Sequence, residues 1–364
     1  IIMSIWKKIL ILLIVIITIS ILIILYRQRV NINKIYEKKE TEEEEEEKVY
    51  TGEDDDISSG QHSEFKTIEK TDIMSVGNFI PPKKLELSDC CIKASCNSAF
   101  TGSYMNLDMI EHILIRGCRF LDFEIYSING HAYVGYSSDN SIINIDSVNK
   151  IPINDVFKAI NNNCFQAPVS NSEDPMFIHL RIKTNNINLY KLVAQAINSN
   201  FSNRLHRGQV TGSSKIDDLR GQYVVIIDKS AAPDYDKYPD CEIEEPCMNL
   251  KNFSVMESGG DILRSVRYLN IINQETSPPN IRDDSITTDT SILKMVLPDI
   301  GANFYGVMNN PKSDVLIQDY GVQIICYNFY NNDEELIKYE KMFEELKAGI
   351  VHLAKAIMYV KYKK

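Results

Sequence analysis

The chain has 364 residues, 44% of them hydrophobic, and a formal net charge of −11. This length suits two domains, or one large domain with an appendage, and the hydrophobic content is sufficient for a sizeable core. The sequence contains no basic stripe, so we expect no nucleic-acid partner.

The N-terminal region predicts a membrane anchor. Residues 1–8 form a basic flank, and residues 9–26 contain no charged side chain. A helix of that length approaches the roughly 30 Å needed to cross a bilayer core. A buried core helix would be less uniformly rich in Ile and Leu, and a signal peptide would need a small-residue cleavage site. We therefore expect a single-pass membrane protein, with orientation left open by the basic residues Arg27 and Arg29 on the far side.

An acidic, disordered linker is predicted over residues 27–84. Within it, residues 37–56 carry twelve acidic residues and three lysines, including six consecutive glutamates at Glu42–Glu47. Like charges repel one another and bury no apolar surface, so this segment is interpreted as a solvated spacer. The ordered domain is expected to begin near Leu85.

From that point the sequence alternates strand and helix patterns. Strands are predicted at Cys91–Ser95, Arg119–Tyr126, Ala132–Tyr136, Met176–Ile182, Tyr223–Ile227, Phe253–Met256 and Val322–Asn328. Helices are predicted at Asn106–Leu114, Asn154–Ile160 and Leu189–Ile197, and the last segment, residues 333–364, is predicted as one long amphipathic helix over Asp333–Tyr362. Alternation of this length predicts an α/β fold, a closed (β/α)8 TIM-type barrel over residues 85–332.

The eight cysteines show neither C-x-x-C pairing nor zinc spacing. This pattern favours reduced thiols in a domain on the cytosolic side of a membrane. A disulfide between Cys241 and Cys247 is left open.

The stretch from Cys91 to Glu124 resembles the opening of the X-box of phosphoinositide-specific phospholipase C. The family motif Ser-His-Asn-Thr/Ser reads Ser95-Cys96-Asn97-Ser98 here, and it is followed by Gly117-Cys118-Arg119 and by the acids Asp122 and Glu124. The X-box resemblance covers residues 88–185, and a Y-box-like part covers residues 250–331. A degenerate X-box behind an N-terminal span is similar to proteins of large DNA viruses, which implies a host or viral membrane.

The resemblance implies cleavage of a phosphodiester by a neighbouring inositol hydroxyl, with two histidines for proton transfer and calcium to offset phosphoryl charge. Cys96 stands where the family has its first histidine, and Val134 stands where it has the second, unless the alignment slips to His131. A thiol with a pKa of about 8.5 is a poor proton donor. We name Cys96 and His179 as candidate catalytic residues and expect weak or absent turnover.

The resemblance also implies a metal site. Asn97, Asp122 and Glu124 are the candidate calcium ligands, because they form an oxygen-rich trio of the kind calcium prefers. The family's next acidic ligand aligns with Arg181, whose guanidinium repels calcium and would pair with the acids. Two interpretations of Arg181 remain open: a built-in cation that replaces calcium, and an ordinary structural ion pair.

Three basic residues, Arg181, Lys183 and Lys229, are candidate substrate-binding residues. His179, Arg181 and Lys183 alternate along one predicted strand, so they share a face and would form a small anion site. The alternative for His179 is an ordinary residue lining the barrel. Lys229 stands where the family has phosphate-contacting lysines, and no counterpart of the Y-box arginine is identified near Leu297–Asn303.

The sequence therefore predicts a membrane-anchored phospholipase C-like phosphodiesterase domain with impaired catalysis. It would act on or bind a phosphodiester or phosphoinositide head group. The alternative is a non-catalytic viral membrane or virion scaffold that uses the barrel to bind protein.

Overall fold

The computed structural model describes residues 53–68, 84–139, 142–184, 186–237, 248–271, 289–299 and 310–363. The chain divides into two units, Ile1–Ser58 and Ser59–Lys364. The predicted span at residues 9–26 lies outside the described residues, as do Cys241 and Cys247. Within the ranges given above, the structure contains no helix with the length and apolar character of a membrane span.

The helices are α2 Glu53–Ile68, α3 Leu107–Ile115, α4 Ile153–Asn163, α5 Asn188–Phe201, α6 Ile216–Leu219, α8 Ser313–Gln318, α9 Glu334–Leu346 and α10 Leu353–Tyr362, with short 3-10 turns η1 Leu87–Asp89 and η2 Leu250–Asn252. The strands are β1 Cys90–Ser95, β2 Phe120–Ile128, β3 His131–Gly135, β4 Ile151–Pro152, β5 Met176–Lys183, β6 Tyr223–Asp228, β7 Met256–Ser258, β8 Leu263–Arg267, β9 Leu293–Leu297, β10 Ile324–Tyr327 and β11 Ile350–His352.

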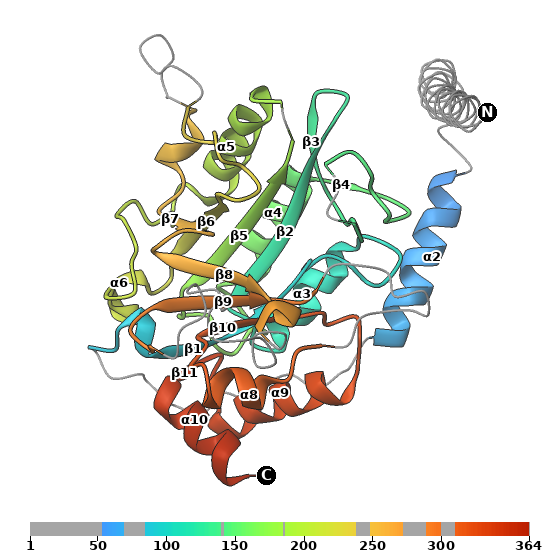
Figure 1. Cartoon of the computed structure of the whole chain (residues 1–364). Helices are drawn as coiled ribbons and strands as arrows, with labels where there is room; N and C mark the ends of the chain where they lie inside the picture. Colours follow the sequence, from blue (N-terminus) through green and yellow to red (C-terminus); the bar gives the residue numbers. More distant parts are fainter. Residues whose placement is uncertain are drawn as a thin grey trace, which may run out of the picture. The chain divides into compact units, whose positions relative to one another are not determined.

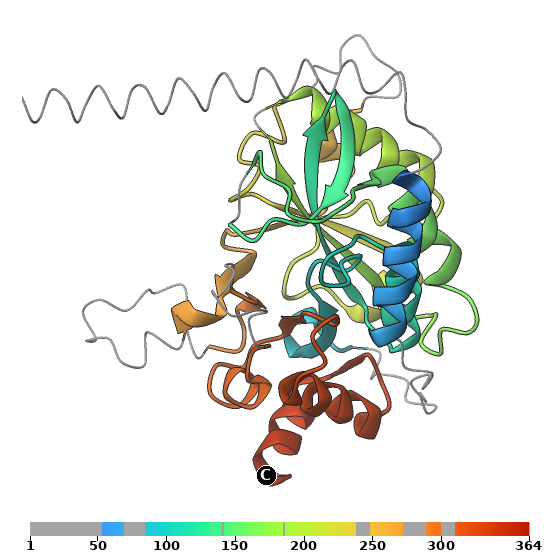
Figure 2. The same cartoon turned by 90° about the vertical axis from the view of Figure 1, so that its right-hand side faces the viewer.

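Eight parallel strands close into a barrel (Figure 1). They follow chain order, β1, β2, β5, β6, β7, β8, β9 and β10, and β10 pairs with β1 to complete the ring. The remaining strands are antiparallel additions: β3 pairs with β2 in a hairpin (Figure 2), β4 pairs with β3, and β11 pairs with β1. The predicted (β/α)8 barrel is therefore confirmed.

Most barrel strands are buried on both faces, which explains why their sequences are rich in apolar residues. All eight residues of β5 and all six of β6 are buried. One apolar cluster fills the barrel interior, and a larger one lies between the strands and the surrounding helices. The inner cluster includes Ile92, Ala94, Phe120, Phe177, Val224 and Met295.

Two barrel strands, β8 and β9, were absent from the sequence prediction. Leu263–Arg267 mixes two arginines and a serine with its apolar residues, and Leu293–Leu297 is short and contains Lys294, which is nevertheless buried. Neither gives a clear strand period. The sixth predicted strand, Phe253–Met256, was placed too early, because Phe253 is the C-cap of η2 and β7 begins at Met256.

The prediction of one helix over Asp333–Tyr362 is wrong. The helix α9 stops at Leu346, because Lys347 adopts a left-handed conformation with φ 55°. The chain then passes close to the barrel, and a Cβ added at Gly349 would lie 2.2 Å from the Gly117 carbonyl oxygen. This close approach leads into β11, which pairs with β1 before α10 begins.

The prediction of disorder throughout residues 27–84 is also wrong for Glu53–Ile68, which forms α2. Phe65 and Ile68 of this helix are 9% and 7% exposed and belong to the larger apolar cluster. The acidic run ends at Asp56, and Phe65 and Ile68, three residues apart in the last turns of α2, lie on one face of the helix. The ordered barrel unit therefore includes residues well before Leu85.

Candidate functional site

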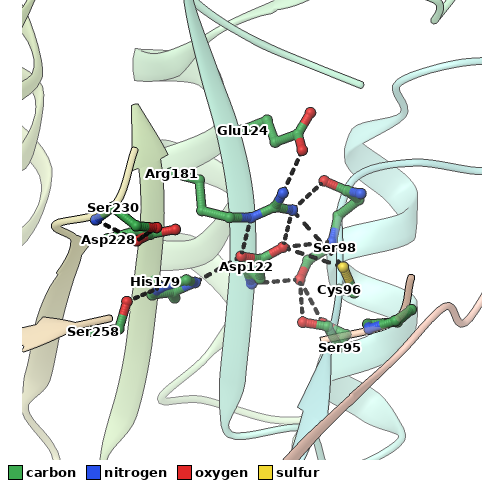
Figure 3. Close-up of polar contacts among 12 residues, drawn as sticks. Ser95, Cys96, Ser98, Asp122, Glu124, His179, Arg181, Asp228, Ser230 and Ser258 are labelled. Atoms are coloured by element: carbon green, nitrogen blue, oxygen red, sulfur yellow. Dashed lines mark hydrogen bonds and ion pairs between the residues drawn. The ribbon is translucent and has the colours of Figure 1, made fainter. Parts of the chain in front are cut away.

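A polar cluster lies inside the barrel toward the carboxyl ends of β1, β2 and β5 (Figure 3). Asp122 and Glu124 are two residues apart on β2, so both point to the same face. In the parallel register, Asp122 is opposite His179 of β5 and Glu124 is opposite Arg181. All four side chains are buried. The rest of the barrel interior is filled by the inner apolar cluster.

The guanidinium of Arg181 occupies the centre of this cluster. Its Nε donates to Oδ1 of Asp122 at 2.9 Å, and its Nη2 donates to Oδ2 of Asp122 at 2.6 Å and to Oδ1 of Asn97 at 2.9 Å. Its Nη1 donates to Oε1 of Glu124. The three oxygen-bearing residues that the sequence proposes as calcium ligands therefore all accept hydrogen bonds from Arg181.

This arrangement fixes the charge state of the ion pair. Burial acts to raise the pKa of Asp122, but the charge of Arg181 and hydrogen bonds from His179 and Arg181 outweigh it and hold that pKa well below its usual range. Burial acts to lower the pKa of Arg181, but Asp122 and Glu124 outweigh it and raise that pKa. Asp122 is therefore a carboxylate and Arg181 a cation across the pH range in which proteins are folded.

The turn after β1 is bonded to β2 through the short motif Ser95–Ser98. Asn97 has φ 44°, a left-handed conformation that asparagine tolerates better than most residues, and its backbone N–H donates to Oδ2 of Asp122 at 3.0 Å. The Ser98 hydroxyl accepts from the Asp122 backbone N–H at 2.9 Å. These bonds bring the Asn97 amide to Arg181.

Cys96 lies in the cluster as the sequence predicts, but as a thiol. Its Sγ donates to Oδ2 of Asp122 at 3.4 Å. Burial, followed by the charge of Asp122, raises the pKa of the Cys96 thiol far above its usual value. A group that keeps its proton in this way is unsuited to act as a general base.

His179 lies one layer deeper than Arg181. Its Nδ1 is 2.7 Å from Oδ1 of Asp122, and its Nε2 is 2.7 Å from the hydroxyl of Ser258, at the end of β7. Both ring nitrogens therefore already have partners, and the side chain is 0% exposed. This geometry favours the interpretation of His179 as a barrel-lining residue.

All six histidines of the chain lie in the described ranges, and among them only His179 contacts Asp122. The position expected for a second histidine, Val134, is buried on β3 and pairs with Ile125. His131 begins the same strand and is exposed. No pair of imidazoles therefore flanks the carboxylates in the described cluster.

The three basic candidates divide between the cluster and the surface. Lys183 lies two residues after Arg181 on β5 and is buried. Burial lowers the pKa of Lys183, and the negative charge of Glu124 opposes this shift only in part. Lys229 instead points to the surface, where its Nζ forms an ion pair with Glu257 at 3.0 Å. The preceding residue, Asp228, is buried, and its carboxylate accepts a hydrogen bond from the Ser230 backbone N–H at 2.9 Å.

Arg267 was missed by the sequence analysis. It is the last residue of β8, and its Nη1 donates to the Pro298 carbonyl at 2.6 Å. Burial lowers its pKa, and the charge of Arg181 lowers it further, which indicates that the two cations share one electrostatic environment. The position could have been found from the rule that functional residues occupy strand ends, had β8 been recognised.

The donor set does not fit calcium while Arg181 is present. Asn97, Asp122 and Glu124 supply suitable oxygens, but each already accepts a hydrogen bond from the guanidinium. Among the described residues, no group of three or more His, Cys, Asp or Glu side chains is arranged to hold a metal ion.

No protein-family model matches the sequence, and no curated protein matches it either. Among solved structures, the chain resembles L. pealei PLC21 (16% identity, TM-score 0.57) and S. officinalis PLC21 (16% identity, TM-score 0.55), each over 78% of this chain and 39% of that chain. A calcium-dependent phosphoinositol-specific phospholipase C from a Gram-negative bacterium, Pseudomonas sp., matches at 12% identity and a TM-score of 0.41, over 75% of this chain and 98% of that chain.

The chain thus spans about two fifths of the length of the two PLC21 chains. These two matches show the fold, which is that of the phospholipase C-like phosphodiesterases. The fold that the X-box resemblance implies is therefore confirmed.

Proposed function

We propose that this chain is a phospholipase C-like domain that binds a phosphodiester or phosphoinositide head group at the barrel mouth, with weak or absent turnover. The single observation that carries the proposal is the position of Arg181, bonded to Asp122, Glu124 and Asn97 inside a complete barrel of this fold. The guanidinium supplies a fixed positive charge at the place where the resemblance implies calcium. We propose that the domain therefore needs no metal.

The remaining hydrogen-bonding capacity of Arg181 supports binding of an anion. A guanidinium has five N–H donors, and the bonds to Asp122, Asn97 and Glu124 use four of them. One N–H on Nη1 is left for a phosphoryl oxygen. The charge of Arg181 is offset by Asp122 and Glu124, so it attracts an anion only weakly. Lys183 and Arg267 add positive charge nearby that attracts the phosphoryl group.

Proton transfer is the step that we propose has been lost. A phosphodiester is cleaved by removing a proton from the attacking hydroxyl and donating one to the leaving oxygen, and each such group typically contributes about 10²- to 10⁴-fold. Cys96 keeps its proton, and both nitrogens of His179 are engaged. We propose that His179 orients Asp122 toward Arg181 and moves no proton of the substrate.

We further propose that residues 9–26 anchor the domain in a host or viral membrane, as their uncharged sequence predicts. An anchor places a weakly binding barrel at high local concentration beside its lipid. The residues between the anchor and α2 would act as the spacer.

The test is a comparison of lipid binding and lipid hydrolysis by the purified full chain. We expect hydrolysis of phosphatidylinositol at least about 10²-fold below that of an active phospholipase C, with no further loss in Cys96→Ala. We also expect vesicles that contain phosphatidylinositol to bind more tightly than phosphatidylcholine vesicles. Arg267→Gln should remove that preference, and Lys229→Gln, at the surface, should preserve it. Robust hydrolysis that disappears in Cys96→Ala contradicts the proposal.

A second candidate function is a protein-binding scaffold. It is favoured by the same contacts of Arg181, since a guanidinium held by two carboxylates is largely neutralised. The vesicle experiment separates the two functions. Equal binding to both kinds of vesicle, unchanged by Arg267→Gln, would favour the scaffold.

A further inference from the structure

The loop between β1 and α3 carries an unusual contact with α2. Three donors of this loop converge on one oxygen, Oε2 of Glu64: the Thr101 hydroxyl at 2.5 Å, the Ser103 backbone N–H at 3.2 Å and the Tyr104 backbone N–H at 3.1 Å. The loop therefore provides a set of donors arranged around a single anionic oxygen.

The backbone of the loop explains this convergence. Gly102 has φ 123°, a conformation that side chains rarely adopt, and a Cβ there would lie 3.3 Å from the Glu64 carboxylate. The turn is closed by the Thr101 backbone N–H, which donates to the Tyr104 carbonyl at 2.9 Å. Glycine thus allows the loop to turn while the carboxylate approaches its backbone.

Contacts beside Glu64 hold the helix independently of the carboxylate. The Gln61 amide donates to the Met105 carbonyl at 2.6 Å, and the Phe65 ring meets the His112 ring edge to face at 5.7 Å. Gly60 faces Tyr104 so closely that a Cβ would lie 2.4 Å from its hydroxyl oxygen. Removing the Glu64 carboxylate is therefore expected to vacate the loop donors while the helix stays in place.

The loop is connected to the polar cluster of the barrel. The Phe100 backbone N–H donates to the Asn97 carbonyl at 2.8 Å, and Thr101 follows Phe100 directly. The Phe100 ring stacks on the Tyr136 ring, with centroids 4.1 Å apart. An anion bound at residues 101–104 would therefore lie on the same loop that carries Asn97 to Arg181.

We propose that residues 101–104 form an oxyanion-binding site, which Glu64 fills within the chain and which a phosphate group can occupy in its place. The ligand class follows from the donors, two backbone amides and one hydroxyl, which suit carboxylate and phosphate oxygens alike. Glu64 has the advantage of being attached, so it excludes free anions at low concentration. A phosphate group that displaces Glu64 would release α2 from the loop.

The experiment is hydrogen exchange of the full chain, read from the peptide that contains Ser103 and Tyr104. In Glu64→Ala we expect faster exchange than in the parent. Acetate replaces the atoms that the substitution removes, so it should restore protection, and so should inorganic phosphate. Each probe should slow exchange about tenfold at about ten times its dissociation constant. Ser63→Ala, an exposed neighbour on α2, should exchange like the parent. It should not respond to either probe at these concentrations, because the attached Glu64 still fills the site.

Glu64→Gln keeps the size of the side chain and is the second variant if Glu64→Ala does not fold. It should show faster loop exchange than the parent, because a neutral amide accepts these hydrogen bonds less strongly. If neither substitution changes hydrogen exchange in the loop, the proposed site is wrong. It is also wrong if neither acetate nor phosphate slows exchange in Glu64→Ala. Protection by acetate alone would overturn the part of the proposal that concerns phosphate.

The source of the phosphate is distinguished by a parallel arm with vesicles. Vesicles of phosphatidylcholine with phosphatidic acid should protect the loop in Glu64→Ala if lipid head groups reach it. Protection by free phosphate without protection by vesicles assigns the site to a soluble anion. Because this readout involves neither hydrolysis nor Arg267, it can fail while the proposed head-group site stands.

Discussion

At the scale of single residues, the centre of the barrel depends on one guanidinium among three oxygen groups. Asp122 and Arg181 are 0% and 1% exposed, so neither charge is solvated by water. Each is tolerated there because the other is present. The sequence predicts that Arg181 pairs with Asp122 and Glu124, and the hydrogen bonds show this pairing. It could be predicted because residues two apart on a strand point to the same face.

Removing one partner of this pair should be strongly destabilising. In Arg181→Met the carboxylates of Asp122 and Glu124 remain buried without a cation, and we expect the free energy of unfolding to fall by about 3–5 kcal/mol. Lys229→Met, which removes an exposed ion pair with Glu257, should change it far less, because water screens that pair. Urea unfolding of both variants measures the difference, and equal effects would contradict a buried pair.

The same pair predicts how stability depends on pH. The pKa of Asp122 is held well below its usual range in the folded state, so the unfolded chain takes up this proton first as pH falls. The stabilisation from Asp122 is fully present above the ordinary aspartate pKa of about 4 and is lost as pH falls below it toward the lower pKa of the folded state. As pH falls below about 5, the free energy of unfolding should therefore decrease less steeply in Asp122→Asn than in the parent. Parallel curves of this free energy against pH would refute the depressed pKa of Asp122.

Several site residues could not be found from sequence. Ser258 and Arg267 stand at the ends of strands whose short or mixed patterns give no clear period. Glu64 was missed because it follows an acidic run, and composition alone assigned the whole segment to a spacer. Lys229 was placed in the site by resemblance, but its side chain points to the surface, where it pairs with Glu257.

At the scale of elements, the barrel was largely predictable where a strand is buried on both faces. A continuous apolar run marks β6, and β5 alternates apolar residues with His179, Arg181 and Lys183; their observed bounds begin at the predicted residues Met176 and Tyr223. The C-terminal segment failed for a tertiary reason. Its apolar spacing continues past the end of α9, at Leu346, Ile350 and Leu353, but Lys347 adopts a left-handed conformation that ends the helix. Gly349 then allows the close approach to the backbone of Gly117.

This close approach can be tested with one methyl group. In Gly349→Ala the added Cβ would lie 2.2 Å from the Gly117 carbonyl oxygen, so backbone must shift and the protein should lose about 1–3 kcal/mol of stability. Gly260→Ala is the matched control, because no atom lies within 4 Å of the added Cβ there. Thermal unfolding should show a lower midpoint for Gly349→Ala alone, and an unchanged midpoint would refute the packing.

At the scale of the whole molecule, the barrel unit includes the second half of α2. Phe65 and Ile68 bury apolar surface against the helices of the barrel, and Glu64 and Gln61 bond to the loop before α3. A fragment that begins at Leu85 lacks all of these contacts. We expect it to unfold at lower urea concentration than a fragment that begins at Glu53, with a smaller dependence on urea because less surface is buried. Identical unfolding curves would show that α2 contributes nothing to the barrel.

The molecule as a whole combines a phospholipase C-like barrel with a cation built into its centre. Calorimetric titration of the full chain with calcium tests this account most directly. We predict no binding at micromolar calcium, because Arg181 already bonds to the oxygens of Asn97, Asp122 and Glu124. Stoichiometric binding of calcium at micromolar affinity would contradict it.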